Sequence, residues 1–402
     1  MLRSSSLRCA SFVEPMKLKQ SPEDFLVEEQ TQVVPGDSGN FAFYRLEKVN
    51  WTTPDALSLI RRRWKLSPRR LSYGGLKDRH ARTTQYLSIH HGPNRNLSQD
   101  GICLTFLGYL QRPYGSEDIH ANRFVVTLRD LDPTQRTAIE SRLSAVERLG
   151  VPNYFDDQRF GSVSGPGGKF IGRLLIQGQF EEALKQALAG HYPYDNAATK
   201  AQKQLLRQHW GDWTLLKDKL PRGHARSLVD YLRVHPGDFK GAVVRLRPEL
   251  RGLYLSAYQS HLWNRMLARW IEQRTTPETR RSIMQRLGPV PLPLHLSETD
   301  QQAYERLNLP LPSSRWKPAA DDPRLALVQE ILAEDGLTLQ GMQIRGVREL
   351  YFSRGERAGR VTVAQLSHAW ADDERHPGRL RLTLRFELER GSYATLVVKA
   401  IL

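Results

Sequence analysis

The segment LRLTLRFELE, residues 380–389, is the feature that most restricts how this chain can fold. Successive side chains of a β-strand point to opposite faces, and here every second residue is apolar. The residues of this apolar face are Leu380, Leu382, Leu384, Phe386 and Leu388. Such a strand needs a sheet to lie in and a second layer to cover its apolar face, so we expect a β-rich domain.

The first 130 residues contain further predicted strands and one predicted helix. NFAFYRLE (40–47) and NRFVVTLRDL (122–131) alternate in hydropathy, and TTQYLSIH (83–90) is β-rich in composition. WTTPDALSLIRRRWKL (51–66) has the start signals of a helix, and we expect Thr53 to cap it, with Pro54 in its first turn.

The middle of the chain, from about residue 160 to 344, is helical in its spacing. YLSAYQSHLWNRMLARWI (254–271) repeats its apolar residues at helical intervals, whereas GPVPLPLHL (288–296) and LNLPLPSSRWKP (307–318) are predicted to be proline-punctuated connections. Strands at both ends and helices between them predict an α+β protein, in which one β-rich domain is interrupted by an insertion.

The chain is strongly basic, with a net charge of +16 and a sequence pI near 9.9. This excess fits a partner that carries phosphates, although a merely basic surface is the alternative. The densest cluster, RRRWKLSPRR (61–70), has six basic residues and no acid. Arg61, Arg62 and Lys65 are therefore expected to contact nucleic acid, or else only to complement the end of a helix dipole.

Several classes of site are excluded or disfavoured. Cys9 and Cys103 are the only cysteines, which excludes a disulfide framework and a Cys-rich zinc site. The histidines form no HExxH pair, and the adjacent His90 and His91 are expected to point apart on a strand, so no metal is predicted. No GxGxxG motif opens a βαβ unit, and we expect no cofactor.

The location of the protein is predicted from its start and its hydropathy. No apolar run approaches the roughly 20 residues that span a bilayer, so no membrane association is expected. The opening MLRSSSLRCASFVEP faintly resembles an organellar presequence, but an untied chain terminus is the commoner explanation. A cytoplasmic monomer is the expectation.

Two segments carry candidate chemistry. GVPNYFDDQRFG (150–161) places aromatic rings beside Arg159, which suits a surface that stacks bases, or equally a structural corner between domains. YGGLKDRHARTTQYLSIHH (73–91) sets one acid, Asp78, among basic side chains that favour its ionised form. That suits a nucleophile or base at neutral pH, and it also suits a salt-bridged turn.

The combination of motifs decides between these alternatives. GGLKDRHARTTQ, ANRF, GVPNYFDDQRFG, YLSAYQSHLWNRML and GSYAT occur in the order seen in the TruD family of pseudouridine synthases, which the chain therefore resembles. The segment SPEDFLVEE (21–29) is also similar to the start of that family. The resemblance covers about residues 18–175, 250–272 and 340–402.

The resemblance implies a fold and a reaction. The fold is α+β, a pseudouridine-synthase fold with a central mixed β-sheet and an inserted, mostly helical domain specific to the family. We expect the catalytic domain over residues 1–159 and 345–402 and the insertion over 160–344. Members of the family isomerise a uridine of RNA to pseudouridine, bacterial ones at position 13 of a tRNA, and need no cofactor.

The resemblance also implies roles for single residues. Asp78, the acid of the GLKD motif, is the expected catalytic residue, and the residues expected to line the uridine pocket are Phe25, Asn122, Phe124 and Tyr393. The residues expected to bind the RNA are Lys77, Arg61, Arg62, Lys65 and Arg159. Two positions depart from the family pattern: Ala121 replaces a usual Gly, and Asp156 stands where Gly is commoner.

Three other readings stay open at this point. The chain could be a non-catalytic RNA-binding protein, a TruD-like synthase that acts on another uridine or another RNA, or a different RNA-modifying enzyme such as a methyltransferase. The intact Asp78 argues against the first, and the missing cofactor loop argues against the last.

Overall fold

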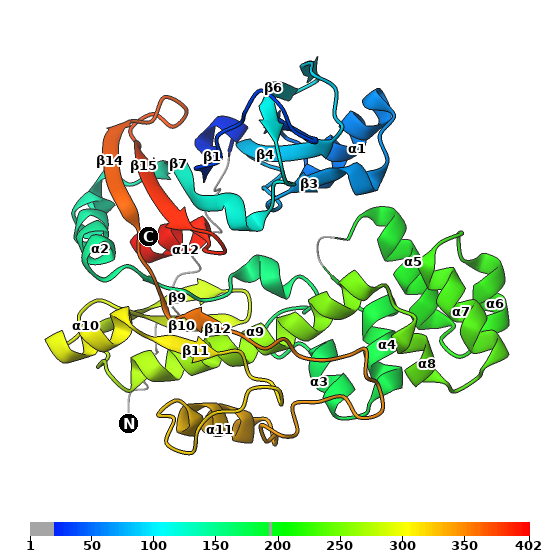
Figure 1. Ribbon diagram of the computed structural model, residues 1–402. Coiled ribbons are helices and arrows are strands. Elements are labelled where there is room, and N and C mark those ends of the chain that lie inside the picture. Colours follow the sequence, from blue (N-terminus) through cyan, green and yellow to red (C-terminus); the bar gives the residue numbers. More distant parts are fainter. Residues whose placement is uncertain (1–19, 193–194) are drawn as a thin grey trace, which may run out of the picture. The chain divides into compact units, whose positions relative to one another are not determined.

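The structure is a computed structural model that describes residues 20–192 and 195–402 (Figure 1). The possible presequence and Cys9 lie outside these residues. The chain divides into two compact units: unit 1 is Met1–Ser141 with Thr362–Ala394, and unit 2 is Arg142–Val361 with Thr395–Leu402. The domain limits at residues 159 and 344 remain a prediction. Within the described ranges, none of the helices combines the length and the apolar character that a membrane span requires.

Unit 1 is built on a nine-stranded mixed sheet, counted over the described residues. Its strand order is β14-β15-β7-β1-β4-β2-β6-β5, and β3 pairs with β4. The pair β1–β4 is parallel and every other pairing of the sheet is antiparallel. The strands are β1 (Phe25–Thr31), β2 (Phe41–Val49), β3 (Leu71–Tyr73), β4 (Arg82–His90), β5 (Leu97–Gln99), β6 (Ile102–Leu110), β7 (Ile119–Leu131), β14 (Ala364–Asp372) and β15 (Leu380–Glu389).

The predicted strand at 380–389 is confirmed as β15, and its alternation matches its burial. Its buried residues are Leu382, Leu384, Phe386 and Leu388. The alternation in β2 is confirmed as well, because Tyr44 and Leu46 join the core under helix α1 whereas Phe43 packs on the opposite face with Tyr114. The two faces of β2 thus pack in different clusters, as the two-residue period of a strand requires.

Helix α1 (Thr53–Trp64) covers one face of β2, β4 and β6. The predicted cap was wrong by one residue: Thr52 is the N-cap, and its hydroxyl accepts a hydrogen bond of 3.2 Å from the Asp55 amide. Thr53 is the first helical residue and is fully buried. Because Thr53 does not cap the helix, its hydroxyl can contact the Lys77 amide and the Gln85 side chain.

Unit 2 is mostly helical around the long helix α9 (Pro248–Glu272). Helices α4 to α8 gather at one end of the unit, and α3 and α11 pack against α9 (Figure 1). The other helices are α3 (Ile171–Ile176), α4 (Phe180–Ala189), α5 (Ala197–Gln208), α6 (Trp213–Lys219), α7 (His224–Val234), α8 (Phe239–Val244), α10 (Glu298–Glu305) and α11 (Leu325–Glu334). Helices α2 (Arg136–Leu149) and α12 (Ala394–Ile401) begin in unit 1 and continue into unit 2.

Unit 2 also contains three two-stranded sheets in its described part. The pairs are β9 (Arg280–Gln285) with β10 (Gly288–Pro293), β11 (Asn308–Pro310) with β12 (Glu356–Ala358), and β8 (Val151–Pro152) with β13 (Arg360–Val361). The connection expected at 288–296 is therefore wrong in its first part, which is strand β10. Its prolines stand at every second position, so all of them fall on one edge, where an edge strand needs no donor.

A second correction concerns the two adjacent histidines. Their ring centroids lie 4.0 Å apart, so the expectation that they point apart was wrong. Strand β4 ends at His90, and His91 takes a left-handed φ of 48° that breaks the alternation. Among the residues that the structure describes, no group of three or more His, Cys, Asp or Glu side chains is placed to hold a metal ion.

Candidate active site

Asp78 lies in the loop between β3 and β4, where the sequence placed it. Its side chain is half-buried, whereas the neighbouring Arg79, His80 and Arg82 are exposed. Strand β4 lies between β1 and β2 inside the sheet, so the loop ends on an interior strand of unit 1.

Two buried polar side chains hold the backbone of this loop. The Thr53 hydroxyl accepts a hydrogen bond of 3.0 Å from the Lys77 amide and donates one of 2.9 Å to Gln85 Oε1. Gln85 in turn donates from Nε2 to the Gly75 carbonyl across 3.2 Å. Gln85 is fully buried on β4, so helix α1 and strand β4 hold Lys77 and Gly75, two points of the loop just before Asp78.

Lys48 on β2 is the third support. Its side chain is fully buried, and its ammonium donates to the carbonyl oxygens of Trp51 at 2.7 Å, Lys77 at 3.3 Å and Asp78 at 2.8 Å. Burial lowers the pKa of Lys48 to about 8, although the negative charge of Asp78 acts in the opposite direction. The backbone on both sides of the Asp78 side chain is therefore held by one cation, whose three donors all have acceptors.

The side chain of Lys77 joins two residues of neighbouring strands. Its ammonium lies 2.8 Å from Glu29 Oε2 on β1 and donates to Asn122 Oδ1 on β7 across 2.6 Å. Glu29 and Asn122 are direct partners in the β1–β7 register. The Lys77 side chain is 8% exposed, and that of Glu29 is 0% exposed. Removing one member of such a buried ion pair costs about 3–5 kcal/mol. Glu29 therefore holds the Lys77 ammonium in place, and this ammonium in turn binds Asn122 Oδ1.

Glu29 is itself anchored by its other oxygen. Glu29 Oε1 accepts hydrogen bonds from the Tyr114 hydroxyl at 2.8 Å and from the Tyr86 amide at 3.2 Å. Burial raises the pKa of the Tyr114 hydroxyl well above its usual value, and the Glu29 charge adds to this effect. Tyr114 therefore stays a donor at every physiological pH, and the carboxylate keeps its orientation toward Lys77.

Three phenylalanine rings form a row over the same part of the sheet. The ring of Phe124 on β7 lies between Phe25, at 6.2 Å and edge to face, and Phe386, at 5.4 Å and stacked. Phe124 and Asn122 are two residues apart on β7 and so lie on one face. All three rings are buried. Phe25, Asn122 and Phe124, predicted to line a common pocket, thus occupy two adjacent strands of unit 1.

The remaining predicted residues of unit 1 lie at chain turns. Tyr393 follows Gly391, whose φ is +85°, in the turn between β15 and α12, and is half-buried. Arg61, Arg62 and Lys65 lie at the C-terminal end of α1, where Lys65 takes a left-handed φ of 52°. Arg62 and Lys65 are exposed and Arg61 is half-buried.

Arg159 belongs to unit 2 and follows the aromatic segment at 150–161. Its guanidinium lies 5.2 Å from the centroid of the Phe155 ring and donates to the Ser256 hydroxyl across 3.3 Å. Asp156, one of the two departures from the family pattern, has a φ of −92° and needs no left-handed backbone. Its buried carboxylate accepts from the Lys399 ammonium at 2.7 Å and from the Thr395 hydroxyl.

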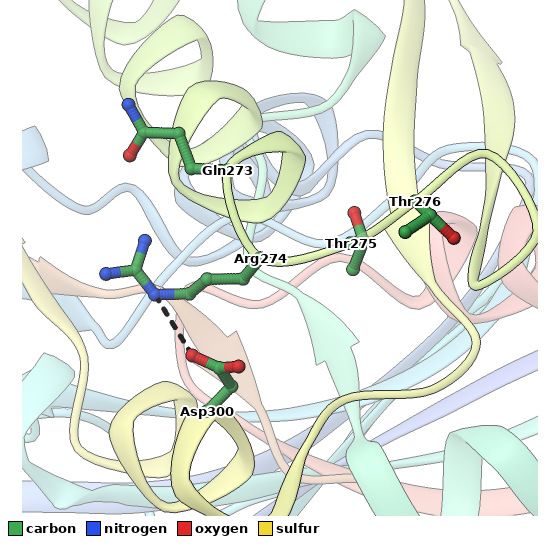
Figure 2. A pocket seen from close by; sticks show the side chains of 5 residues that line it. All are labelled: Gln273, Arg274, Thr275, Thr276 and Asp300. Atoms are coloured by element: carbon green, nitrogen blue, oxygen red, sulfur yellow. Dashed lines mark ion pairs between the residues drawn. The ribbon is translucent and has the colours of Figure 1, made fainter.

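The hollow drawn in Figure 2 lies at the end of α9 in unit 2, and none of the predicted site residues lines it. It measures about 480 Å³, and Arg274 faces Asp300 across 3.4 Å within it. Since the carboxylate neutralises the cation, this hollow is poorly suited to a polyanion.

Sequence reasoning missed the residues that support the Asp78 loop. These are Glu29, Lys48, Thr53, Gln85 and Tyr114. A signal was present for two of them: Lys48 falls on the apolar face of its strand with Tyr44 and Leu46, and Glu29 shares a face with Phe25. A charge on a buried face needs a partner, so both positions indicated buried polar contacts: an ion pair with Lys77 for Glu29 and backbone carbonyls for Lys48.

Comparison with known proteins shows the family to which the chain belongs. A sequence model of the family described as tRNA pseudouridine synthase D (TruD) matches residues 14–401. Relatives include a probable tRNA pseudouridine synthase D 2 of Methanocaldococcus jannaschii, 31% identical over 96% of this chain and 91% of its own length. The tRNA pseudouridine synthase D of Aquifex aeolicus is 28% identical over 96% of this chain and 98% of its own length.

A solved structure agrees with the sequence comparisons. The crystal structure of a putative tRNA pseudouridine synthase D from Methanosarcina mazei superposes with a TM-score of 0.71 at 27% identity, over 96% of this chain and 93% of that one. The predicted α+β pseudouridine-synthase fold, with a mixed sheet and a helical insertion, is therefore confirmed. The family model matches nearly all of the 402 residues of this chain. The chain therefore belongs to the tRNA pseudouridine synthase D family and is an RNA-modifying isomerase.

Proposed function

We propose that this enzyme converts uridine 13 of tRNA to pseudouridine and that Asp78 is its catalytic residue. The observation that carries the proposal is the support of the loop that carries Asp78 by three buried polar side chains, Lys48, Thr53 and Gln85. A structural turn acid needs no such framework, whereas a reacting group must be held in a fixed geometry.

The reaction explains why one ionised carboxylate is enough. The N1–C1′ bond of uridine breaks, a C5–C1′ bond forms, and the hydrogen of C5 is lost while N1 gains one, so atoms and electrons balance without a redox partner. A carboxylate can stabilise positive charge at the sugar, attack it, or remove a proton. Each of these roles needs the ionised form of Asp78, and each is lost with an amide.

The target base needs a place outside the RNA stack. Flipping the nucleotide costs a few kcal/mol, and stacking on an aromatic ring returns roughly 1–3 kcal/mol per base. We assign this role to Phe25, Phe124 and Tyr393, with Asn122 as the polar group that orients the uracil. Lys77 is mostly enclosed, so its proposed contact with the RNA is restricted to a group that enters the site beside Asn122.

The experiment is release of tritium from tRNA labelled at C5 of its uridines, with no cofactor added. The wild-type enzyme should release one tritium per tRNA, and a transcript with cytidine at position 13 should release none. Asp78→Asn should bind tRNA and release no tritium. Asp37→Asn, a change of the same charge at an exposed residue of unit 1, is the matched control and should behave as wild type.

Two results would contradict parts of this proposal. Full release from the cytidine-13 transcript would move the reaction to another uridine of the tRNA. Turnover of Asp78→Asn above a few per cent of wild type would remove Asp78 from the catalytic role.

A further inference from the structure

A cavity of about 650 Å³ lies in unit 2, between residues 314–315 and the segment 342–352. Its floor is apolar and buried: the floor residues are Met342, Ile344, Val347, Leu350 and Phe352. Its rim is polar and exposed, with Arg315, Gln343 and Tyr351 among the rim residues. An apolar floor with a few convergent polar groups is the common architecture of a ligand site.

The rim carries several cations and no acid. Arg315, Arg345 and Arg348 line the cavity, and no Asp or Glu is among its lining residues. Within the described residues, none of these three arginines forms an ion pair with a carboxylate. A fourth cation lies next to the rim, because a side-chain carbon added at Gly346 would collide with the Lys240 ammonium. The cavity thus differs from the hollow in Figure 2, where Asp300 neutralises Arg274.

The rim also offers an aromatic face. Tyr351 is 58% exposed, and the Arg315 guanidinium lies 4.8 Å from its ring centroid. A nucleobase can stack on the free side of such a ring, while the guanidinium beside it binds the attached phosphate. Aromatic rings interleaved with unpaired arginines are the recurring combination in single-strand binding sites.

The walls of the cavity are fixed by a buried amide. Gln259 on α9 is 3% exposed and donates from Nε2 to the carbonyl oxygens of Pro312 at 3.0 Å and Ser353 at 2.8 Å. The Ser313 hydroxyl donates to the Phe352 carbonyl across 3.1 Å and accepts from the Arg315 amide across 3.2 Å. The two segments that carry Arg315 and Tyr351 are therefore held at a set separation before any ligand arrives.

We infer that this cavity binds an unpaired nucleotide of the tRNA substrate, with its base stacked on Tyr351 and its flanking phosphates at Arg315, Arg345 and Arg348. The inference rests on the proposed function and adds a second RNA subsite to it. The cavity shares no residue with the proposed uridine pocket, because every residue assigned to that pocket belongs to unit 1.

The test measures tRNA affinity and chemistry separately. Tyr351→Ala should raise the Kd for an unmodified tRNA transcript about tenfold, within the range of one lost stacking interaction. Tyr351→Phe keeps the ring and should bind within about twofold of wild type. Arg345→Gln should weaken binding and reduce its salt dependence by about one phosphate contact. The single-turnover rate of tritium release at saturating tRNA should stay unchanged in all three variants.

The matched control is Arg233→Gln on α7, which removes the same charge from an exposed arginine that already pairs with Asp230 across 3.2 Å. It should leave the Kd nearly unchanged. Equal affinity of wild type, Tyr351→Ala and Arg345→Gln would overturn the inference, whatever other partner the cavity has. Absence of tritium release from wild-type enzyme would instead contradict the proposed function, and the Kd values would still decide the subsite.

Discussion

The ammonium of Lys48 donates a hydrogen bond of 2.8 Å to the carbonyl oxygen of Asp78, so a buried cation of β2 holds the backbone of the proposed catalytic residue. The same ammonium also binds the preceding carbonyl, that of Lys77. Placing a lysine in the interior is costly, and a flexible loop would gain nothing from it. We conclude that Lys48 is a positioning residue for Asp78.

Replacing Lys48 by methionine tests this role. Lys48→Met keeps most of the volume but removes the donor of three part-buried carbonyls. The free energy of unfolding should therefore fall, by no more than about 3 kcal/mol for each carbonyl left unsatisfied. Because a small shift of a reacting group can cost about a hundredfold, turnover should fall by that order while the Kd for tRNA changes little. Thermal unfolding, tRNA binding and tritium release measure the three quantities.

The control for this variant is Lys317→Met, which removes an exposed lysine of unit 2. It should retain wild-type turnover and stability. If Lys48→Met lost tRNA affinity and turnover in proportion, Lys48 would serve RNA binding or general stability rather than the geometry of Asp78.

The pH dependence of turnover should report Lys48 as well. Burial lowers the pKa of Lys48 from 10.5 to about 8, so in the folded enzyme the ammonium loses its proton as the pH rises through about 8. The neutral amine has two donors for three carbonyls, and single-turnover tritium release should therefore decline above this pH. In Lys48→Met the decline should be absent; a decline of the same shape in that variant would assign it to another group.

The effect of the same titration on stability should have the opposite sign to its effect on turnover. Between about pH 8 and 10.5 the unfolded chain keeps a proton on Lys48 that the folded chain has lost. Since stability rises with pH wherever the unfolded state binds more protons, the contribution of Lys48 to the free energy of unfolding should increase across this window. Comparing wild type with Lys48→Met by denaturant unfolding on both sides of pH 8 isolates the contribution.

Local patterns predicted strands β2, β4, β7 and β15 of unit 1, whereas β6 and β14 were not predicted. Strand β14 is mostly exposed, so its sequence carries no buried alternation. The strand at 380–389 could be read from its alternation alone, and the loop position of Asp78 followed from the strands on either side. Strand β10 could not, because its prolines normally end a strand and are tolerated here only by falling at every second position of an edge.

The supports of the candidate site were harder to predict, because they come from distant parts of the chain. The Thr53 hydroxyl reaches Lys77, and Glu29 reaches Tyr114, through contacts that only the sheet order creates. Hydropathy alone shows that Lys48 lies on a buried face, but it does not show which carbonyls the ammonium meets. The order of strands in a sheet depends on contacts between distant segments, and local sequence patterns do not predict it.

Salt dependence of tRNA binding tests the basic end of α1. The triple variant Arg61→Gln, Arg62→Gln and Lys65→Asn leaves out Arg63 and Arg70, which hold Gln99 and the carbonyl of His90. Asparagine is chosen for Lys65 because it tolerates the left-handed backbone there. If all three cations contact phosphates, the slope of log K against log salt should decrease by about 2–3. An unchanged slope would mean that the three cations only complement the end of the helix and do not contact phosphates. Arg136→Gln, which removes an exposed cation that pairs with Glu140, is the single-charge control.

The row of rings gives the last prediction, because burial and base stacking forecast different losses. Phe124→Ala should lose about 3–5 kcal/mol of stability, as for a core phenylalanine, and should also lose turnover. Phe124→Leu separates the two effects: it keeps an apolar side chain and should cost less than about 1.5 kcal/mol, yet it removes the stacking ring and should still lose most turnover.

Tyr393→Phe should keep most activity and Tyr393→Ala should lose it, with little change in melting temperature, since Tyr393 is only half-buried. Melting temperature and tritium release measured on the same four variants decide between the roles. Wild-type turnover in Tyr393→Ala would place its ring outside the uridine pocket, and wild-type turnover in Phe124→Leu would leave Phe124 as core alone.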